Sequence, residues 1–327
     1  MQRIIIVYNP RSSKHAAIRD EVITPASKFK GCLLGKFEVK HVDLNENATN
    51  LSKILLNGDL VVAAGGDGTG SVALNGAIES GKDVTLAILG FGNFNDFSRT
   101  LGYYNITDII TDFIKSTSSK TANSHIQSLH PLEAIVDGKH YRYSACYFTI
   151  GMFAESTEVF DQKKTRGTLK SGRKSIFYSI KELTKWYFKN KHHHFLPSEI
   201  HLNNVPLNHH NTTDSGRKNR IKGTRISDVL FVNGKTVAKM MKGGKYWQSP
   251  KTFLVSTGRL TNLCHLLSFM AKSIFRRIPG KCTTESITIT FPTKEEIEIQ
   301  GEGEYRRLTL SELLIKKSDK SIKVLAK

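Results

Sequence analysis

A glycine-rich turn with an aspartate at its centre is the segment of this sequence best suited to chemistry. Residues 62–70 read VAAGGDGTG, so an apolar run leads into Gly65, Gly66, Asp67, Gly68 and Thr69. Glycines let a ligand approach the backbone, and the N-terminus of a following helix offers N–H groups to phosphate. A carboxylate suits such a loop if it holds Mg²⁺ or orients a hydroxyl. The alternative is a tight turn in which the aspartate caps the helix.

Two further polar segments follow apolar runs. The first consists of Asn9, Pro10, Arg11, Ser12 and Ser13, and the second, GFGNFND at 90–96, contains Gly92, Asn93, Asn95 and Asp96. Ligands of open parallel sheets bind beyond the carboxyl ends of the strands, so all three segments are expected at one sheet edge. Asp67 and Asp96 would then converge as a magnesium site. Taken alone, Arg11 suits a solvated loop as well as a phosphate contact, Asp96 suits a helix cap, and Asn95 suits a turn.

The first half of the chain alternates between short apolar runs and helical patterns. Strands are predicted at 4–8, 36–44, 59–66 and 84–90, with helices between them and at 105–116. This alternation predicts an α/β fold with a parallel sheet covered on both faces.

The second half has a different rhythm. Two β-type runs flank Asp137-Gly138, a hairpin signal, and further runs lie at 227–238, 252–258, 286–292 and 296–310. We expect a mainly antiparallel β domain with a few helices, at 172–190 and 261–277. The predicted domains are 1–125 and 126–327, with a cleft between them, and the last strand could return to the first domain.

The three polar segments together resemble a known family. GGDGT at 65–69 resembles the signature of the diacylglycerol kinase catalytic-domain family of lipid kinases, which is related to sphingosine kinases. Residues 9–13 resemble its NPxSG loop, and residues 90–102 resemble its PxGTxNDFAR-x-LG segment. NAD kinases share GGDGT but follow it with a different asparagine motif, so the NDF sequence and the NPxSG-like start argue against them.

The resemblance implies a lipid kinase that transfers the γ-phosphoryl group of ATP, with Mg²⁺, to diacylglycerol or a similar lipid. The nucleotide-binding residues would be Asn9, Pro10, Arg11, Ser12, Ser13, Gly65, Gly66, Gly68, Thr69, Gly92, Asn93 and Asn95. Asp67 and Asp96 would be catalytic and would hold the metal. GEGE at 301–304 stands where the family has DGE, which makes Glu304 the general base. Without the family, an exposed acidic hairpin tip is the better interpretation of GEGE.

Several positions depart from the family pattern. Ser13, Gly90 and Asn93 replace glycine, proline and threonine, while Phe153 and Thr257 stand where aspartates are expected. These changes keep open a second interpretation, in which a weakened relative acts as a nucleotide-binding or membrane-binding regulator.

The positive charge is concentrated in the second half. Of the 48 Lys and Arg and 29 Asp and Glu side chains, residues 1–130 hold 13 and 12, which leaves a net +18 for residues 131–327. Between Lys163 and Arg225 there are 15 basic side chains and three acids, interleaved with aromatic residues. We expect docking on an anionic membrane surface. No motif for specific nucleic-acid binding is present.

The four cysteines are scattered and no apolar run approaches the ~20 residues of a membrane span. We therefore expect a cytoplasmic, peripherally membrane-associated protein. The sequence leaves a homodimer open.

Overall fold

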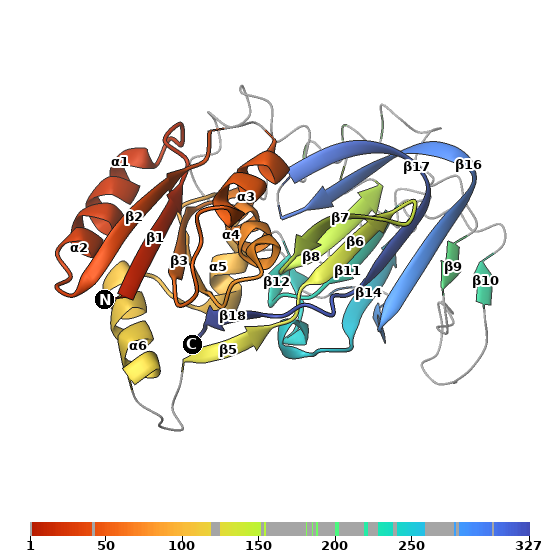
Figure 1. The fold of residues 1–327 in the computed structure, drawn as a ribbon. Helices are drawn as coiled ribbons and strands as arrows, with labels where there is room; N and C mark the ends of the chain where they lie inside the picture. The colour runs from red at the N-terminus through yellow and green to blue at the C-terminus, as the bar shows by residue number, and fades with distance from the viewer. Residues whose placement is uncertain are drawn as a thin grey trace. The chain divides into compact units, whose positions relative to one another are not determined.

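A computed structural model describes most of the 327-residue chain. The described residues are 2–40, 43–118, 125–151, 228–237, 241–258, 281–302 and 304–327, the short strands at 200–202 and 219–221, and residues 154, 181, 185, 188 and 278. The chain divides into two compact units, one made of Met1–Pro131, Tyr143–Ala145 and Ser318–Lys327, the other of Leu132–Arg142 and Cys146–Lys317. The expected fold class is confirmed by both units, which are drawn in Figure 1.

The first unit contains a six-stranded sheet in the order β2-β1-β3-β4-β18-β5. The strands are β1 (Gln2–Tyr8), β2 (Cys32–Glu38), β3 (Leu60–Gly65), β4 (Thr85–Gly90), β5 (Ile126–Leu129) and β18 (Ile322–Leu325). All neighbours run parallel except β18 and β5. Residues Leu60–Gly65 are buried throughout, as expected for a central parallel strand with both faces covered.

The second strand was expected too late in the sequence. A strand was predicted at 36–44, but β2 covers Cys32–Glu38 and a helix begins at Leu44. The apolar alternation continues past the strand, but the Asp43 side chain accepts a hydrogen bond from the Asn45 N–H and so caps the helix. The cap accounts for the helix that begins at Leu44, within the range where a strand was predicted.

Helices cover both faces of this sheet (Figure 1). They are α1 (His15–Ile18), the π-helical turn η1 (Arg19–Ile23), α2 (Thr24–Ser27), α3 (Leu44–Ser52), α4 (Asp67–Ser80), α5 (Asp96–Leu101) and α6 (Ile106–Ser118). The segment 15–27 and α6 pack on the face that carries Ile4, Ile6 and Val62. Helices α3, α4 and α5 lie on the other face, where Gly70 of α4 approaches Phe97 and Ile88.

Helices α3 and α4 cross at close range. A Cβ atom added to Gly76 would lie 2.9 Å from the carbonyl oxygen of Ala48 and 3.0 Å from the Leu51 side chain. Only glycine fits at this crossing without moving the backbone of α3. The glycine thus fixes the distance between the two helices.

The second unit is built around an eight-stranded sheet in the order β15-β14-β11-β8-β16-β17-β6-β7. The strands are β6 (Leu132–Val136), β7 (Lys139–Ser144), β8 (Tyr147–Gly151), β11 (Asp228–Val232), β14 (Phe253–Gly258), β15 (Lys281–Thr284), β16 (Ser286–Gly301) and β17 (Glu304–Lys317). The pairings with determined register are antiparallel, as the sequence predicts. Smaller elements are β9 (Ile200–Leu202), β10 (Asn219–Ile221), β12 (Thr236–Val237), β13 (Met241–Lys242) and η2 (Tyr246–Gln248).

The predicted hairpin at Asp137-Gly138 is present between β6 and β7. Both residues have positive φ, +46° and +77°, as a two-residue hairpin turn of type I′ requires. Asp137 also accepts hydrogen bonds from the backbone N–H groups of Ser311 and Glu312, which lie on β17. The turn is therefore fixed both by its own backbone and by the neighbouring strand.

No helix among the described residues is long and apolar enough to cross a membrane. Most of the basic stretch 163–225, the predicted helices at 172–190 and 261–277, and Phe153 lie outside the described residues.

Candidate functional site

The three polar segments singled out in the sequence all follow strands of the parallel sheet. Residues 9–13 follow β1, residues 65–69 end β3 and open α4, and residues 90–96 end β4 and open α5. Strands β1, β3 and β4 are neighbours in that order and run parallel. Their carboxyl ends, and with them the three segments, therefore lie at one edge of the sheet.

The turn at 65–69 is compact because glycine residues, which lack side chains, let neighbouring atoms approach the backbone closely. Gly66 caps α4, and its carbonyl oxygen accepts hydrogen bonds from the N–H groups of Thr69 (3.0 Å) and Gly70 (3.1 Å). A Cβ atom on Gly65 would lie 2.4 Å from Oγ1 of Thr69. The Thr69 side chain thus packs against the strand end, and the residue that caps α4, Gly66, has no side chain.

The second segment touches this turn backbone to backbone. The N–H of Phe91 donates to the carbonyl oxygen of Gly65 (2.8 Å), and a Cβ atom on Gly92 would lie 2.6 Å from Cα of Gly66. A residue larger than glycine at position 92 would push the two segments apart. The structure therefore brings together the two glycine-rich turns that the sequence analysis placed at one edge.

Asp67 and Asp96 open two successive helices and lie close to each other. Oδ1 of Asp67 accepts the backbone N–H of Phe97 (3.2 Å), and the N–H groups of Asn95 and Asp96 also bond to this carboxylate. Asp96 is 1% exposed. Burial, followed by the negative charge of Asp96, raises the pKa of Asp67 well above the usual range of a carboxyl group.

A cation would relieve the repulsion between these two carboxylates. Both offer the oxygen ligands that Mg²⁺ prefers, and Mg²⁺ is commonly shared between one or two carboxylates and the phosphates of a substrate. Among the described residues, no three His, Cys, Asp or Glu side chains gather closely enough to hold a metal by themselves. The two carboxylates are therefore suitable ligands for a divalent cation.

Asn95 shapes its own turn. Its backbone is in the left-handed region (φ +56°), and its Oδ1 accepts the N–H of Gly92 (2.7 Å). A Cβ atom on Gly90 would lie 2.7 Å from the Asn95 side chain. The Asn95 side chain can therefore occupy this position only because residue 90 is glycine. Asn93, by contrast, is exposed. Of these two predicted nucleotide-binding side chains, the exposed one is the better placed to meet a ligand.

The loop after β1 is held by its polar residues. Oδ1 of Asn9 accepts the N–H of Arg11 (2.9 Å), and Oγ of Ser12 accepts the N–H of Lys14 (3.2 Å). The Arg11 guanidinium donates to the carbonyl oxygen of Lys40. These contacts form a turn that leads from the strand into the helical segment, and Arg11 remains a predicted phosphate contact.

The predicted base Glu304 lies at the start of β17 in the second unit. Its carboxylate pairs with Arg142, which is 3% exposed, and with Arg306 at 2.9 Å. The neighbouring Glu302 is 1% exposed with φ +50°, and accepts the backbone N–H of Cys146 (2.9 Å). Gly301 and Glu304 pair where β16 ends and β17 begins, and the carboxylates of Glu302 and Glu304 both have partners.

Sequence reasoning missed the two arginines that contact Glu304. Arg142 and Arg306 carry no motif, since an arginine in an alternating β-strand looks like any solvated residue. The one available signal is that Arg142 lies between two tyrosines in the apolar run 141–151, where a charge needs a buried partner.

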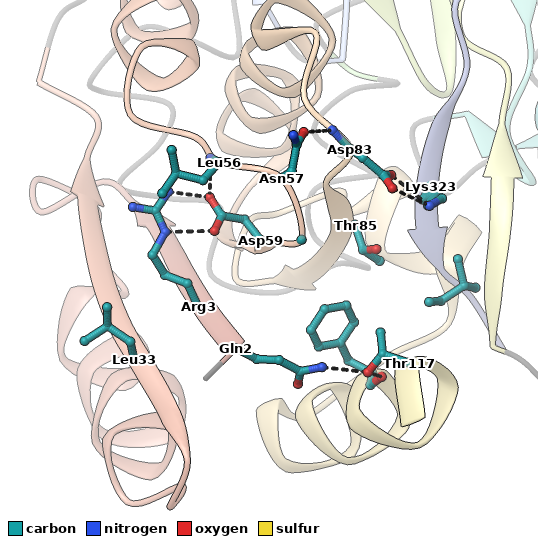
Figure 2. A pocket seen from close by; sticks show the side chains of 13 residues that line it. Gln2, Arg3, Leu33, Leu56, Asn57, Asp59, Asp83, Thr85, Thr117 and Lys323 are labelled. Carbon is teal, nitrogen blue, oxygen red and sulfur yellow. Dashed lines mark hydrogen bonds and ion pairs between the residues drawn. The ribbon is translucent and has the colours of Figure 1, made fainter. Parts of the chain in front are cut away.

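A separate cavity of about 680 Å³ opens at the opposite edge of the parallel sheet (Figure 2). It is lined by the first residues of strands, including Arg3 and Thr85. Its charges are matched internally: Arg3 pairs with Asp59, and Lys323 pairs with Asp83 at 2.8 Å. None of the predicted site residues lines this cavity.

A parallel α/β unit with apposed glycine-rich turns, joined to an antiparallel β unit, is the fold that the chain shares with solved structures. Two solved structures from Bacillus anthracis str. Sterne, each described as a "putative diacylglycerol kinase", match all of the chain. The TM-scores are 0.63 and 0.60, with 17% and 18% identity, over 97% and 98% of those chains. At this identity the likeness shows the fold. Residues 3–126 match the family model for the diacylglycerol kinase catalytic domain, which supports the resemblance that the glycine-rich turns carry.

Two curated relatives match part of the chain. The diacylglycerol kinase of Bacillus subtilis (strain 168) is 32% identical over 111 residues, covering 31% of this chain and 34% of the relative. A "Putative lipid kinase" of Staphylococcus carnosus (strain TM300) is 27% identical over 124 residues, covering 38% and 35%. The chain thus spans about a third of the length of each relative in sequence. The two glycine-rich turns lie within the residues that match the family model.

Proposed function

We propose that this protein is a lipid kinase, which transfers the γ-phosphoryl group of ATP to a hydroxyl of diacylglycerol or a similar lipid. The observation that carries the proposal is the contact between the turns at 65–69 and 90–96, with Asp67 and Asp96 at the starts of two helices. Helix N-termini and bare glycine backbone suit a triphosphate. Two close carboxylates suit the Mg²⁺ that accompanies it.

The residues divide the chemistry between them. Asn9 to Ser13, Gly65 to Thr69 and Gly92 to Asn95 would hold the nucleotide. Asp67 and Asp96 would hold Mg²⁺, and the metal would supply positive charge to offset that of the phosphates. The lipid oxygen bonds to the γ-phosphorus as the bond to the bridging oxygen of the β-phosphate breaks, and ADP leaves. Glu304 takes the hydroxyl proton.

The proposed acceptor lies in a membrane, so the protein must dock on a lipid surface. Residues 229–284 contain ten Lys and Arg side chains and no Asp or Glu. Among the described members, Lys242, Lys245 and Lys251 are exposed. Lysines near an anionic membrane are attracted by about 1 kcal/mol each. This segment, together with the basic stretch 163–225, supports peripheral attachment to an anionic membrane.

The test is transfer of radiolabel from γ-labelled ATP into diacylglycerol. Asp67→Asn removes a metal-binding charge and keeps an oxygen for the backbone N–H groups, so we expect transfer to fall about 100-fold or more. Asp20→Asn is the matched control, because Asp20 is exposed and lies outside the site. Equal transfer by the wild type and Asp67→Asn would remove the assignment.

A second candidate function is a nucleotide-binding or membrane-binding regulator without turnover. The two arginines beside Glu304 favour this alternative, because they stabilise the charged carboxylate and so weaken it as a base. Thermal stabilisation by ATP with Mg²⁺, without transfer to any member of a broad lipid panel, would support the regulator over the kinase.

A further inference from the structure

A buried amide on helix α4 holds the backbone of a strand far away in the sequence. The Asn75 side chain is 4% exposed and lies eight residues after Asp67 on the same helix. Its Oδ1 accepts the N–H of Tyr143 (2.9 Å), while its Nδ2 donates to the carbonyl oxygens of Tyr143 (3.1 Å) and Ser71 (2.9 Å). Both backbone groups of one residue are thus bonded to a single side chain, as a neighbouring β-strand would bond them.

The residues around Tyr143 belong to the first unit although the chain on either side belongs to the second. Tyr143–Ala145 is part of the first unit, whereas Arg142 and Cys146 are part of the other. Tyr143, Ser144 and Ala145 are 4%, 0% and 0% exposed. This three-residue strap is therefore a buried piece of the first unit, and Asn75 satisfies the two backbone groups at its start.

The residue directly before the strap, Arg142, is the buried ion-pair partner of Glu304. Arg142 is 3% exposed and pairs with Oε2 of Glu304, while Arg306, which pairs with Oε1, is 38% exposed. An arginine that is nearly inaccessible has few alternative rotamers, so its position follows its own backbone. That backbone is one peptide bond away from the residue that Asn75 holds.

We infer that Asn75 is a positioning residue: by fixing Tyr143, it fixes Arg142 and through it the carboxylate of Glu304. Helix α4 would then carry Asp67 at its first turn and, about 12 Å further along its axis, the side chain that orients the base. The inference rests on the proposed function for its catalytic meaning. Loss of Asn75 is expected to act on the chemical step and not on the binding of ATP.

The first test measures whether Asn75 holds this strand. Asn75→Ser is too short to bond both groups of Tyr143, so we expect amide hydrogen exchange at residues 139–144 to become about tenfold faster or more. Asn47→Ser is the matched control. Asn47 is also a buried amide of the first unit (1% exposed), but it bonds Lys40 and Asp43. Unchanged exchange at 139–144 in Asn75→Ser, or equal acceleration in the control, overturns the inference.

The second test is a double-mutant cycle on lipid phosphorylation. Asn75→Ser is expected to lower kcat about 10- to 100-fold and leave KM for ATP unchanged. Added to Glu304→Gln, it should cause no further loss, since it acts through Glu304. A multiplicative loss in the double variant, or a rise in KM for ATP, would mean that Asn75 acts elsewhere. If Asn75→Ser does not fold, Arg142→Lys tests the link between residue 142 and Glu304. Arg142→Lys should then cause no further loss of kcat when it is added to Glu304→Gln.

Failure of the inference and failure of the proposed function give different results. A wild-type protein that transfers no phosphoryl group refutes the kinase proposal and the catalytic part of the inference, while hydrogen exchange still decides whether Asn75 holds the strand. An active wild type with faster exchange but unchanged kcat in Asn75→Ser refutes the positioning role alone.

Discussion

The pKa of the Lys317 side chain depends strongly on its surroundings. It is 5% exposed at the end of β17, and its Nζ donates to Oδ1 of Asn233 and to the carbonyl oxygen of Tyr246 (2.8 Å). Both of these acceptors are uncharged oxygen atoms. Burial lowers the pKa of Lys317 to about 7.

This lowered pKa predicts a stability that rises with pH. Between the folded pKa of about 7 and the unfolded value near 10.5, the unfolded chain binds the proton and the native protein does not. Stability therefore increases with pH in this window, by at most about 1.4 kcal/mol per pH unit. Urea unfolding of the wild type and Lys317→Met from pH 7 to 9.5 measures the difference. Lys242→Met, at an exposed site, should keep the wild-type slope. Equal slopes for Lys317→Met and the wild type would contradict the argument.

At the scale of elements, the crossing of α3 and α4 decides where the glycine-rich turn can lie. Helix α4 opens at the turn and is buried over most of its length, between α3 and the sheet. Its position is set by Gly76, which meets the backbone of Ala48. The site is thus positioned from the middle of the helix as well as from its first turn.

The crossing predicts that Gly76→Ala destabilises the protein. Alanine stabilises a helix interior by up to about 1 kcal/mol over glycine, but the added Cβ would lie 2.9 Å from a carbonyl oxygen. Overpacking of this kind costs about 1–3 kcal/mol, so a net loss of about 1–2 kcal/mol is expected in urea unfolding. Gly68→Ala is the control on the same helix, because its Cβ would meet Leu44 at an ordinary 3.5 Å. A gain in stability for both variants would argue against close packing at the crossing.

At the scale of the whole molecule, the two parts of the chain differ sharply in charge. The first 130 residues are nearly neutral, and the rest carry a net +18. In the first unit Lys323 and Lys327 pair with aspartates, whereas Lys242, Lys245 and Lys251 form no ion pair within the described part of the chain. Exposed lysines suit diffuse attraction to lipid headgroups, because an ammonium group acts as a point charge.

Neutralising two of these lysines should weaken membrane binding. Lys242→Gln with Lys245→Gln is expected to lower the affinity for phosphatidylglycerol-containing vesicles about 25-fold, at roughly 1 kcal/mol per lysine. Co-sedimentation with such vesicles, and with pure phosphatidylcholine, measures the effect. The pair Lys28→Gln with Lys30→Gln changes two exposed lysines of the first unit and serves as the control. Equal losses for both pairs would show that net charge alone attracts the membrane.

The sequence was informative where function is carried by contiguous residues. The turns at 65–69 and 90–96 follow buried strands, so both the strands and their shared edge could be predicted. The partners of Glu304 and the role of Asn75 could not, because Arg142 and Tyr143 come from strands 68 and more residues away. Such pairings depend on how distant strands are ordered, which no local pattern encodes. Strand β2 begins and ends earlier than the strand predicted at 36–44. The cap at Asp43 starts a helix at Leu44, although the apolar alternation of the sequence continues to that residue.

The place of β18 in the sheet has a consequence for synthesis in the cell. This strand, Ile322–Leu325, lies between β4 and β5 and is an interior strand of the sheet that begins at residue 2. While the ribosome is still translating, the nascent N-terminal region therefore lacks an interior strand and exposes the edge of β4. The unit that is made first can close its sheet only after residue 325 has emerged, so a stalled or prematurely terminated chain would present an open edge to chaperones and proteases.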